Sequence, residues 1–285
     1  MKHYAIIGHP IAHSLSPLMH NRAFEILGRK ARYDAHDILP EELSTTVARL
    51  TEEGIAGFNV TIPHKHAILS SLATIDEAAQ QIGAVNTVVN RDGLLFGTNT
   101  DAYGVFQSLA PFADRIRQAN VLMIGAGGSA RAVLFSLLKD FAPSEITIAT
   151  RTIAKAEALA LHFQPLAPGI PIRTFTASKD VLNTLIGSAT LVINTSPVGM
   201  APHDTASPLP AGIGIRPDQV VFDLIYTPLQ TTLLRDAAAA GATAIGGLEM
   251  LLHQGARSFE IWTGERMPLD QIRPLVTEAL RSRTH

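Results

Sequence analysis

A lysine at the end of an apolar segment is the residue of this chain best suited to do chemistry. The largely apolar run 55–60 ends before Pro63, and Lys65 follows directly after that stop. Ligands of open α/β sheets collect beyond the carboxyl ends of the strands. A lysine there can exchange a proton with a substrate hydroxyl, although an isolated lysine is more often a solvated surface residue. Lys65, with Asn59 and Thr61 beside it, is therefore a candidate acid or base.

Two serines near the N-terminus predict an anion site. Ser14 and Ser16 follow a short apolar strand at 4–7, and Ser16 precedes Pro17 as an N-cap precedes the first residue of a helix. The unpaired backbone N–H groups and the dipole at a helix N-terminus favour an anion. We expect a carboxylate there; the alternative is that both serines only cap the helix.

A predicted β-hairpin supplies further polar groups. The runs 83–90 and 94–101 are separated by Arg-Asp-Gly, and their outer ends carry Asn86 on one side and Thr100 and Asp101 on the other. An aspartate near a lysine would keep its ammonium charged and oriented for proton exchange. Asp101 also fits the N-cap of a helix that begins at 102.

The second half of the chain opens with a dinucleotide-binding pattern. Residues 121–134 combine an apolar strand, a glycine turn and a helix, and they fit G-x-G-x-x-G/A with Gly125, Gly127 and Ala130 in the three positions. Gly125 permits the tight turn, Gly127 lets the backbone approach a pyrophosphate, and Ala130 lets the helix pack on the strand.

The end of the next strand favours NADP over NAD. An NAD site calls for an acid here to bind the ribose 2′-hydroxyl, whereas a 2′-phosphate calls for a guanidinium. The strand 145–150 is followed by Arg151 and, one helical turn later, Lys155, with no acid before Glu157.

These segments resemble the shikimate dehydrogenase family over nearly the whole chain. The resemblance rests on ordered motifs at Gly8–Asn21, Asn59–Lys65, Asn86–Thr87, Asn99–Asp101, Gly125–Arg131, Thr150–Thr152, Asp223–Pro228 and Gly247–Gln254. Thr150 stands where the family has an asparagine, which leaves the strength of the preference for NADP open.

The resemblance implies an activity and a role for each matching residue. The reaction is NADPH + 3-dehydroshikimate → shikimate + NADP⁺, a step of aromatic amino acid (chorismate) biosynthesis, with Lys65 and Asp101 as the catalytic pair. The substrate carboxylate would be bound by Ser14, Ser16 and Tyr226, and the ring hydroxyls by Thr61, Asn86, Thr100 and Gln254, with Asn59 also at the substrate. The residues implied at the cofactor are Gly125, Ala126, Gly127, Gly128, Ser129, Ala130, Thr150, Arg151, Thr152, Lys155, Thr195, Ser196 and Gly247.

Strands and helical runs alternate along the chain, which predicts two α/β domains with parallel sheets. We expect a substrate-binding domain at 1–102 plus 248–285, a Rossmann-like NADP-binding domain at 103–247, and the active site in the cleft between them. The expected strands are 3–8, 31–38, 57–62, 85–90, 94–98, 121–125, 145–150, 171–176, 190–195, 220–225 and 242–246.

Composition agrees with a soluble enzyme. The 285 residues suit two domains, 46% of them are hydrophobic, and a net charge of −2 gives no electrostatic reason to expect nucleic acid. No apolar stretch reaches the ~20 residues that span a bilayer, and no targeting segment is apparent.

The absence of cysteine excludes disulfides and thiol chemistry and fits the cytoplasm. The eleven histidines lack a metal-binding pattern, so we expect no metal site. The oligomeric state stays open, and a homodimer is compatible with the sequence.

Three other functions remain open. A quinate or dual quinate/shikimate dehydrogenase using NAD would have an acid where Arg151 stands. A paralogue could act on a different small hydroxy acid. A non-catalytic nucleotide sensor would be expected to have lost Lys65 or Asp101, and both are present.

Overall fold

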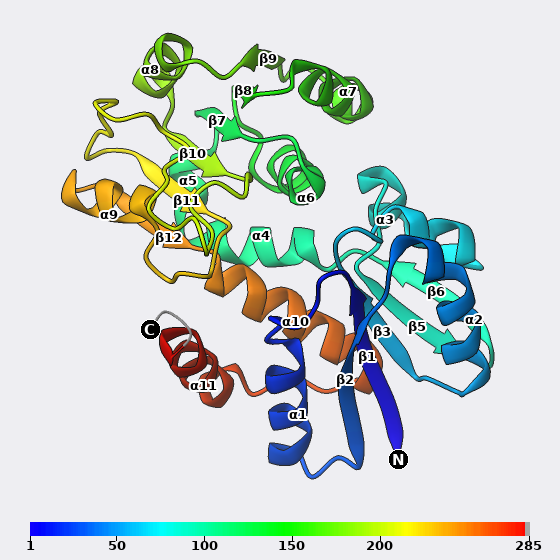
Figure 1. Ribbon diagram of the computed structural model, residues 1–285. Helices are drawn as coiled ribbons and strands as arrows, with labels where there is room; N and C mark the ends of the chain where they lie inside the picture. Colours follow the sequence, from blue (N-terminus) through cyan, green and yellow to red (C-terminus); the bar gives the residue numbers. More distant parts are fainter. Residues whose placement is uncertain (283–285) are drawn as a thin grey trace. The chain divides into compact units, whose positions relative to one another are not determined.

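The computed structural model describes residues 1–282, and the chain divides into two compact units (Figure 1). Unit 1 comprises Met1–Tyr103 and Leu252–Ala279; unit 2 comprises Gly104–Leu251 and resumes at Leu280. The predicted substrate domain extends to residue 285, and its residues 283–285 lie outside the described part of the chain.

Unit 1 is built on a six-stranded mixed sheet with the strand order β2-β1-β3-β5-β6-β4. The strands are β1 (Lys2–Gly8), β2 (Ala31–Asp37), β3 (Gly57–Val60), β4 (Thr74–Ile75), β5 (Thr87–Arg91) and β6 (Leu94–Thr98). The helices are α1 (Ser16–Ile26), α2 (Leu43–Glu52), α3 (Glu77–Ile82), α11 (Leu269–Ser282) and the parts of α4 (Asp101–Leu109) and α10 (Leu248–Thr263) that belong to this unit. Short 3₁₀ turns are η1 (Pro40–Glu42) and η2 (Ala67–Ser71). The expected hairpin is present as β5 and β6, whereas the two-residue strand β4 was not expected.

The strand register gathers four chain ends at one edge of this sheet. β1 and β3 are parallel, with Ile7 opposite Val60. β5 runs antiparallel to β3 and then to β6, so Thr87 lies opposite both Asn59 and Thr98. The ends of β1, β3 and β6 and the start of β5 therefore meet at the same edge, which is where ligands of such sheets bind.

Apolar layers cover both faces of the unit 1 sheet. On one face, side chains of α2, α3 and η2 join those of the strands in a single core cluster. On the other face, α1 and α10 supply an aromatic cluster: the Tyr4 ring lies 5.4 Å from Phe24 and 5.1 Å from Trp262, and His20 stacks on Tyr33 at 4.3 Å. The strand period of two explains why Ala5 and Ile7 face the first layer and Tyr4 the second.

Unit 2 has the Rossmann strand order. All its strand pairs are parallel, and the order β12-β11-β10-β7-β8-β9 corresponds to 6-5-4-1-2-3 when the strands are counted within the unit. The strands are β7 (Asn120–Ile124), β8 (Glu145–Thr150), β9 (Ile172–Thr176), β10 (Leu191–Asn194), β11 (Val220–Asp223) and β12 (Thr243–Gly246). The helical segments are η3 (Ala110–Phe112), α5 (Ala113–Ile116), α6 (Gly128–Ser136), η4 (Leu137–Phe141), α7 (Ile153–Phe163), η5 (Gln164–Leu166), α8 (Lys179–Ser188) and α9 (Thr232–Ala239). The predicted α/β class with a Rossmann-like unit is thus confirmed.

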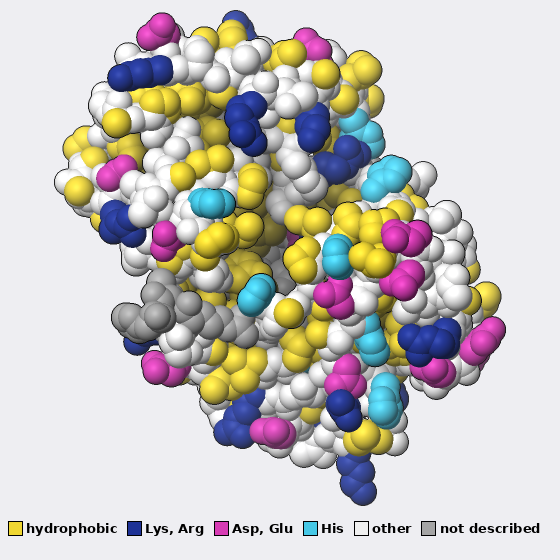
Figure 2. Space-filling view, in the orientation of Figure 1, with side chains coloured by type: hydrophobic (Ala, Val, Ile, Leu, Met, Phe, Trp, Pro, Cys, Tyr) yellow, Lys and Arg dark blue, Asp and Glu magenta, His cyan; other side chains and the backbone are white. Residues whose placement is uncertain are grey.

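The surface carries charges of both signs. On the face that Figure 2 shows, the Lys and Arg side chains are scattered among Asp, Glu and uncharged groups. Among residues 1–282, no helix combines the length and the apolar composition that crossing a membrane would require.

Candidate functional site

Lys65 and Asp101 meet at the edge of the unit 1 sheet where the four chain ends converge. Lys65 Nζ lies 2.5 Å from Asp101 Oδ2, and the two side chains expose 19% and 9% of their surface. The carbonyl oxygen of Lys65 accepts a hydrogen bond from the backbone N–H of Val85 (2.9 Å), which ties the turn after β3 to the chain entering β5. An ammonium has three donors, so the bond to Asp101 still leaves N–H groups for a substrate oxygen.

Asn86 fixes the orientation of Asp101. Its Nδ2 donates to Asp101 Oδ1 (2.8 Å), and its Oδ1 accepts from the backbone N–H of Thr100 (2.7 Å). One carboxylate oxygen of Asp101 thus faces Asn86 and the other faces Lys65. Because Asn86 is buried, these bonds are shielded from water and hold the pair in one geometry.

The expected capping role of Asp101 is wrong. α4 begins at Asp101 itself, and the side-chain oxygen of Asn99 accepts from the N–H groups of Asp101 (3.0 Å) and Ala102 (3.4 Å). Asn99 therefore caps the helix, which leaves the Asp101 carboxylate to Lys65 and Asn86.

Asn59 and Thr100 lie beneath the pair rather than at an open surface. Asn59 is 5% exposed; its Oδ1 accepts from the Tyr33 hydroxyl (2.7 Å), and its Nδ2 lies 3.0 Å from Ser258 Oγ. The Thr100 hydroxyl is likewise enclosed, 3.1 Å from Ser258 Oγ. Both side chains can therefore affect the Lys65–Asp101 pair only indirectly, through the residues to which they are hydrogen-bonded.

Ser14 and Ser16 lie at the start of α1, with Ser14 half-buried and Ser16 buried. The predicted N-cap at Ser16 is wrong: Ser16 is the first helical residue, and its backbone N–H donates to Ser14 Oγ (3.3 Å). The Ser16 hydroxyl bonds Tyr33 instead; burial raises the pKa of the Tyr33 phenol well above its usual value, and the Ser16 hydroxyl partly offsets this.

Three further predicted substrate residues are half-buried, two of them in unit 1 and one in unit 2. Gln254 is half-buried on the part of α10 that belongs to unit 1, and its carbonyl oxygen accepts from Ser258 Oγ (3.1 Å). Tyr226 is half-buried in unit 2, in the segment that follows β11. Thr61 is half-buried in unit 1, directly after β3.

The glycine turn of unit 2 has the geometry that a dinucleotide needs. Gly125 has a φ of +110°, and a Cβ there would lie 2.8 Å from Thr195 Oγ1, so only glycine fits. A Cβ at Gly127 or Gly128 would meet nothing within 4 Å. The open space lies beside the N-terminus of α6, where backbone N–H groups and the helix dipole can bind a pyrophosphate. Ala130 is fully buried, as close packing of helix on strand requires.

Arg151 and Lys155 follow β8 with their charges exposed. Within residues 1–282, no carboxylate forms an ion pair with either side chain, so both remain available to an anion. Thr150 is half-buried and Thr152 is exposed beside them.

A buried carboxylate that the sequence did not reveal as functional holds the loops that follow β10 and β11, at the same carboxyl edge of the sheet as the glycine turn. Asp223 accepts hydrogen bonds from Asn194 Nδ2 (3.0 Å) and Thr231 Oγ1 (2.7 Å), and burial raises its pKa. Asn194 Oδ1 in turn accepts from the N–H (3.0 Å) and the hydroxyl (2.7 Å) of Ser196. The available signals were the motif Asp223–Pro228 and the position of Asp223 and Asn194 as the last residues of β11 and β10.

Gly247 is a second position where backbone approach demands glycine. A Cβ there would lie 2.1 Å from the carbonyl oxygen of Leu224, while the Gly247 N–H donates to the carbonyl oxygen of Ile225 (3.1 Å). The segment that carries Tyr226 is therefore packed against the chain that enters α10.

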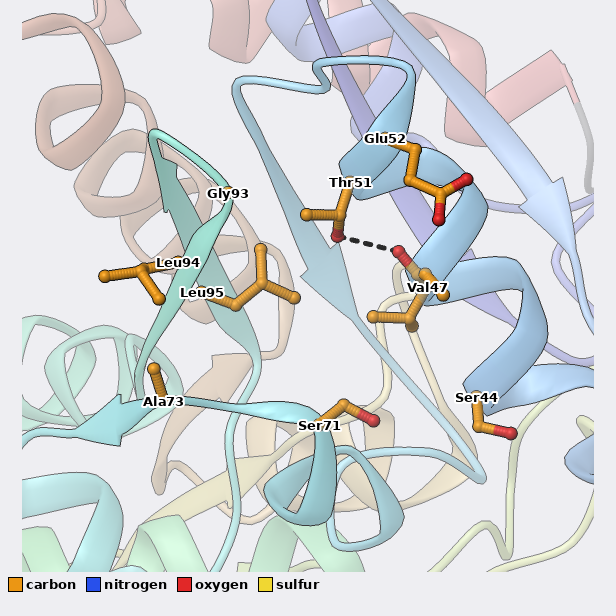
Figure 3. A pocket seen from close by; sticks show the side chains of 10 residues that line it. Ser44, Val47, Thr51, Glu52, Ser71, Ala73, Gly93, Leu94 and Leu95 are labelled. Atoms are coloured by element: carbon orange, nitrogen blue, oxygen red, sulfur yellow. Dashed lines mark hydrogen bonds between the residues drawn. The ribbon is translucent and has the colours of Figure 1, made fainter.

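A groove elsewhere on unit 1 contains none of the predicted site residues (Figure 3). It has a volume of about 440 Å³ and lies between α2 and the β5–β6 hairpin, with Val47 and Leu95 at its walls. In the described part of the chain, no three His, Cys, Asp or Glu side chains are grouped as metal ligands would be.

Comparisons with known families agree with this arrangement. Residues 6–88 match the shikimate dehydrogenase substrate binding domain, and residues 247–277 match the shikimate 5′-dehydrogenase C-terminal domain. Residues 121–201 match the saccharopine dehydrogenase NADP binding domain.

Whole-chain relatives carry the same name. The NADP⁺-dependent shikimate dehydrogenase of Geobacillus kaustophilus is 43% identical over 98% of this chain and 99% of its own. Shikimate 5-dehydrogenase of Thermus thermophilus, solved with NADP(H) and shikimate, is 37% identical with a TM-score of 0.85 over 99% of both chains. The Listeria monocytogenes enzyme, solved with shikimate and NAD, is 34% identical with a TM-score of 0.89 over 97% of this chain and 96% of its own. Because identity at this level extends over almost the full length, the chain belongs to the shikimate dehydrogenase family.

Proposed function

We propose that this chain catalyses the reversible, NADPH-dependent reduction of 3-dehydroshikimate to shikimate, a step towards chorismate. The observation that carries the proposal is the Lys65–Asp101 pair, which is partly shielded from water and lies at the ligand-binding edge of unit 1. A general acid must reach the oxygen that gains a proton, and a lysine at this edge meets that requirement.

In the proposed reaction, the chemistry that NADPH supplies when bound is the hydride for the carbonyl carbon. Lys65 Nζ donates a proton to the carbonyl oxygen as that oxygen becomes an alcohol. Asp101 holds the ammonium through Oδ2 and offers a route by which Lys65 regains a proton. In the reverse direction Lys65 accepts the hydroxyl proton.

Polar residues would orient the substrate. We assign Ser14 and Tyr226 to its carboxylate, and Thr61 and Gln254 to ring hydroxyls, since these four residues are half-buried rather than enclosed. We also assign Ser16 to the carboxylate, where its buried hydroxyl would have to bind in addition to, or in place of, its bond to Tyr33. Asn86 would bind a ring hydroxyl while keeping its hydrogen bond to Asp101. For Asn59 and Thr100, whose side chains are enclosed, we propose a supporting role instead of direct contact.

The residues of unit 2 fit a 2′-phosphorylated dinucleotide. The open side of Gly127 and Gly128 leaves space for the pyrophosphate at the N-terminus of α6. Arg151 and Lys155 carry no carboxylate partner among the described residues, which suits a phosphate and not a neutral hydroxyl. The loop with Thr195 and Ser196, together with Gly247, would lie nearer the nicotinamide.

The test is a steady-state assay of the purified protein with shikimate or quinate and with NADP⁺ or NAD⁺, followed by the absorbance of the reduced cofactor. We expect shikimate with NADP⁺ to give the highest kcat/KM. A higher kcat/KM for quinate with NAD⁺ would support the quinate dehydrogenase alternative. Lack of turnover with either acid, with the protein folded and binding NADP⁺, would support the sensor alternative.

A further inference from the structure

We propose that a buried cluster of Thr87, Ser258 and Asn59 is a positioning group that orients Asn86, and through it Asp101 and Lys65. This inference rests on the proposed function and extends it to residues that do not touch the substrate. Thr87 begins β5, Ser258 lies on α10, and Asn59 lies on β3, so the cluster joins three elements that meet at the edge of the sheet.

The hydroxyls of Thr87 and Ser258 form the centre of the cluster, and the Thr100 hydroxyl contacts both of them. Thr87 Oγ1 lies 2.8 Å from Ser258 Oγ and 3.2 Å from Thr100 Oγ1, and Ser258 Oγ lies 3.1 Å from Thr100 Oγ1. The side chains of Thr87 and Ser258 are fully buried. Because buried hydroxyls are costly when unpaired, removing one of them should disturb the others.

Asn59 donates hydrogen bonds to the cluster. Its Oδ1 accepts from the Tyr33 hydroxyl, so its Nδ2 points towards the cluster, where it lies 3.0 Å from Thr87 Oγ1, Ser258 Oγ and the carbonyl oxygen of Asn86. An amide NH₂ can only donate, and these three oxygens share its two protons. The amide oxygen Oδ1 of Asn86, 3.0 Å from Thr87 Oγ1, can only accept, so Thr87 is the donor in that bond.

That bond adds to the contacts that determine which way the Asn86 amide faces. With Oδ1 accepting from the Thr87 hydroxyl and from the Thr100 N–H, Nδ2 faces Asp101 Oδ1. The reversed amide would place its oxygen against the Asp101 carboxylate and its NH₂ against the Thr100 N–H, and both contacts are repulsive. The Thr87 hydroxyl thus stabilises the orientation in which Asp101 Oδ2 is directed at Lys65.

Ser258 links the same network to the helix that carries Gln254. Its hydroxyl is 3.1 Å from the carbonyl oxygen of Gln254, one helical turn earlier. Ser258 therefore lies on the face of α10 that is directed at the strand ends, in register with a proposed substrate residue. Its removal should disturb the acid–base pair without removing a substrate contact.

The main test compares two substitutions of Thr87 in steady-state kinetics with shikimate and NADP⁺. Thr87→Val keeps the shape and removes the hydroxyl; we expect kcat to fall about tenfold with KM within about twofold of wild type, the scale of one hydrogen bond acting through another residue. Thr87→Ser keeps the hydroxyl and should restore most of kcat. If both variants are equally slow, or if Thr87→Val raises KM and leaves kcat unchanged, the positioning role is wrong.

Ser258 provides an independent comparison in case Thr87→Val does not fold. Ser258→Ala should also lower kcat at constant KM. Thr263→Val is the matched control, because the Thr263 hydroxyl makes the same bond to the preceding turn of α10 (Phe259 carbonyl oxygen, 2.8 Å) but has no contact with the cluster. Equal kcat values for Ser258→Ala and Thr263→Val would overturn the proposal.

A spectroscopic readout separates this inference from the proposed function. The side-chain amide signals of Asn86, assigned by their loss in Asn86→Asp, should shift in ¹⁵N–¹H spectra of Thr87→Val and Ser258→Ala but stay in place in Thr263→Val. If the wild-type protein is inactive but the two variants show these shifts, the proposed function is refuted and the positioning role is still supported. Unchanged Asn86 signals in both variants would refute the positioning role itself.

Discussion

Enclosed polar groups, rather than surface contacts, determine the geometry around Lys65. Asp101 is held through both carboxylate oxygens, one by Lys65 and one by Asn86. Buried polar groups of this kind stabilise one geometry only when every donor and acceptor is satisfied. The rate of proton transfer should therefore be sensitive to single atoms at these positions.

The serines at the start of α1 should affect affinity and not the chemical step. Replacing Ser14 and Ser16 together with alanine removes two hydrogen bonds to an anion, each worth ~1.5–3 kcal/mol, so KM for shikimate should rise at least ~10-fold. Ser70→Ala is the control, because Ser70 is exposed and its hydroxyl donates to the carbonyl oxygen of Ala67. An unchanged KM in the double variant would show that these serines serve only the helix.

Gly8 should be intolerant of a methyl group. A Cβ at Gly8 would lie 2.3 Å from Thr61 Cγ2 and 3.0 Å from the carbonyl oxygen of Ile62, so Gly8→Ala must displace the turn that leads to Lys65. We expect kcat/KM to fall roughly 10–100-fold, since a small misplacement of reacting groups has effects of this size. Gly187→Ala, on α8 where no atom lies within 4 Å of the added Cβ, is a control for chain flexibility and should retain kcat/KM.

The residue types around the site were largely predictable, whereas their supporting contacts were not. The sequence pattern alone places Lys65 after a strand and Asp101 at the end of a hairpin. Ser258 shares one network with Asn59 although the two lie 199 residues apart, and no local pattern encodes such a contact. The distribution of caps was also misjudged, because Asn99 and Asp101 are equally good helix-capping types.

At the scale of elements, strand ends and helix starts bring the functional groups together. In unit 1 this depends on the antiparallel pairing of β5, which returns the chain to the edge where β1 and β3 end. The Arg-Asp-Gly turn made that hairpin predictable. The strand β4 was missed because its two residues are too few to show any period.

The start of α7 should decide which cofactor is used. Arg151→Ala with Lys155→Ala should lower kcat/KM for NADP⁺ and leave that for NAD⁺ nearly unchanged, because only NADP⁺ has a 2′-phosphate to lose. The preference of the wild type should also weaken as added salt screens the charges. Lys179→Ala, an exposed cation at the start of α8, is the control. Equal slowing with both cofactors would mean that these cations serve the fold.

At the scale of the whole molecule, the aromatic layer of unit 1 should limit its stability in acid. His20 is fully buried, and among the described residues neither ring nitrogen has a hydrogen-bond partner. Burial lowers the pKa of His20 to about 3. Its ring lies 5.4 Å from that of Trp262, the single tryptophan of the chain, whose fluorescence therefore reports on this layer.

The sign of the effect follows from proton binding. Between pH 6.5 and 3 the unfolded chain protonates His20 and the folded chain does not, so the free energy of unfolding should decrease by roughly 1.4 kcal/mol per pH unit as the pH falls through this range. Above pH 6.5 His20 is neutral in both the folded and the unfolded chain, so the free energy of unfolding no longer depends on its protonation. Urea unfolding followed by Trp262 fluorescence should show a weaker acid dependence for His20→Phe than for wild type. The exposed His3→Phe is the control; equal acid dependence of all three proteins would refute this interpretation.

The most direct test of the central claim compares turnover with binding in Lys65→Met. We expect kcat for shikimate oxidation with NADP⁺ to fall ~10²–10⁴-fold, the usual contribution of a general acid or base, while the calorimetric Kd for shikimate changes much less. A loss of binding as large as the loss of kcat/KM would contradict the account, because Lys65 would then only hold the substrate.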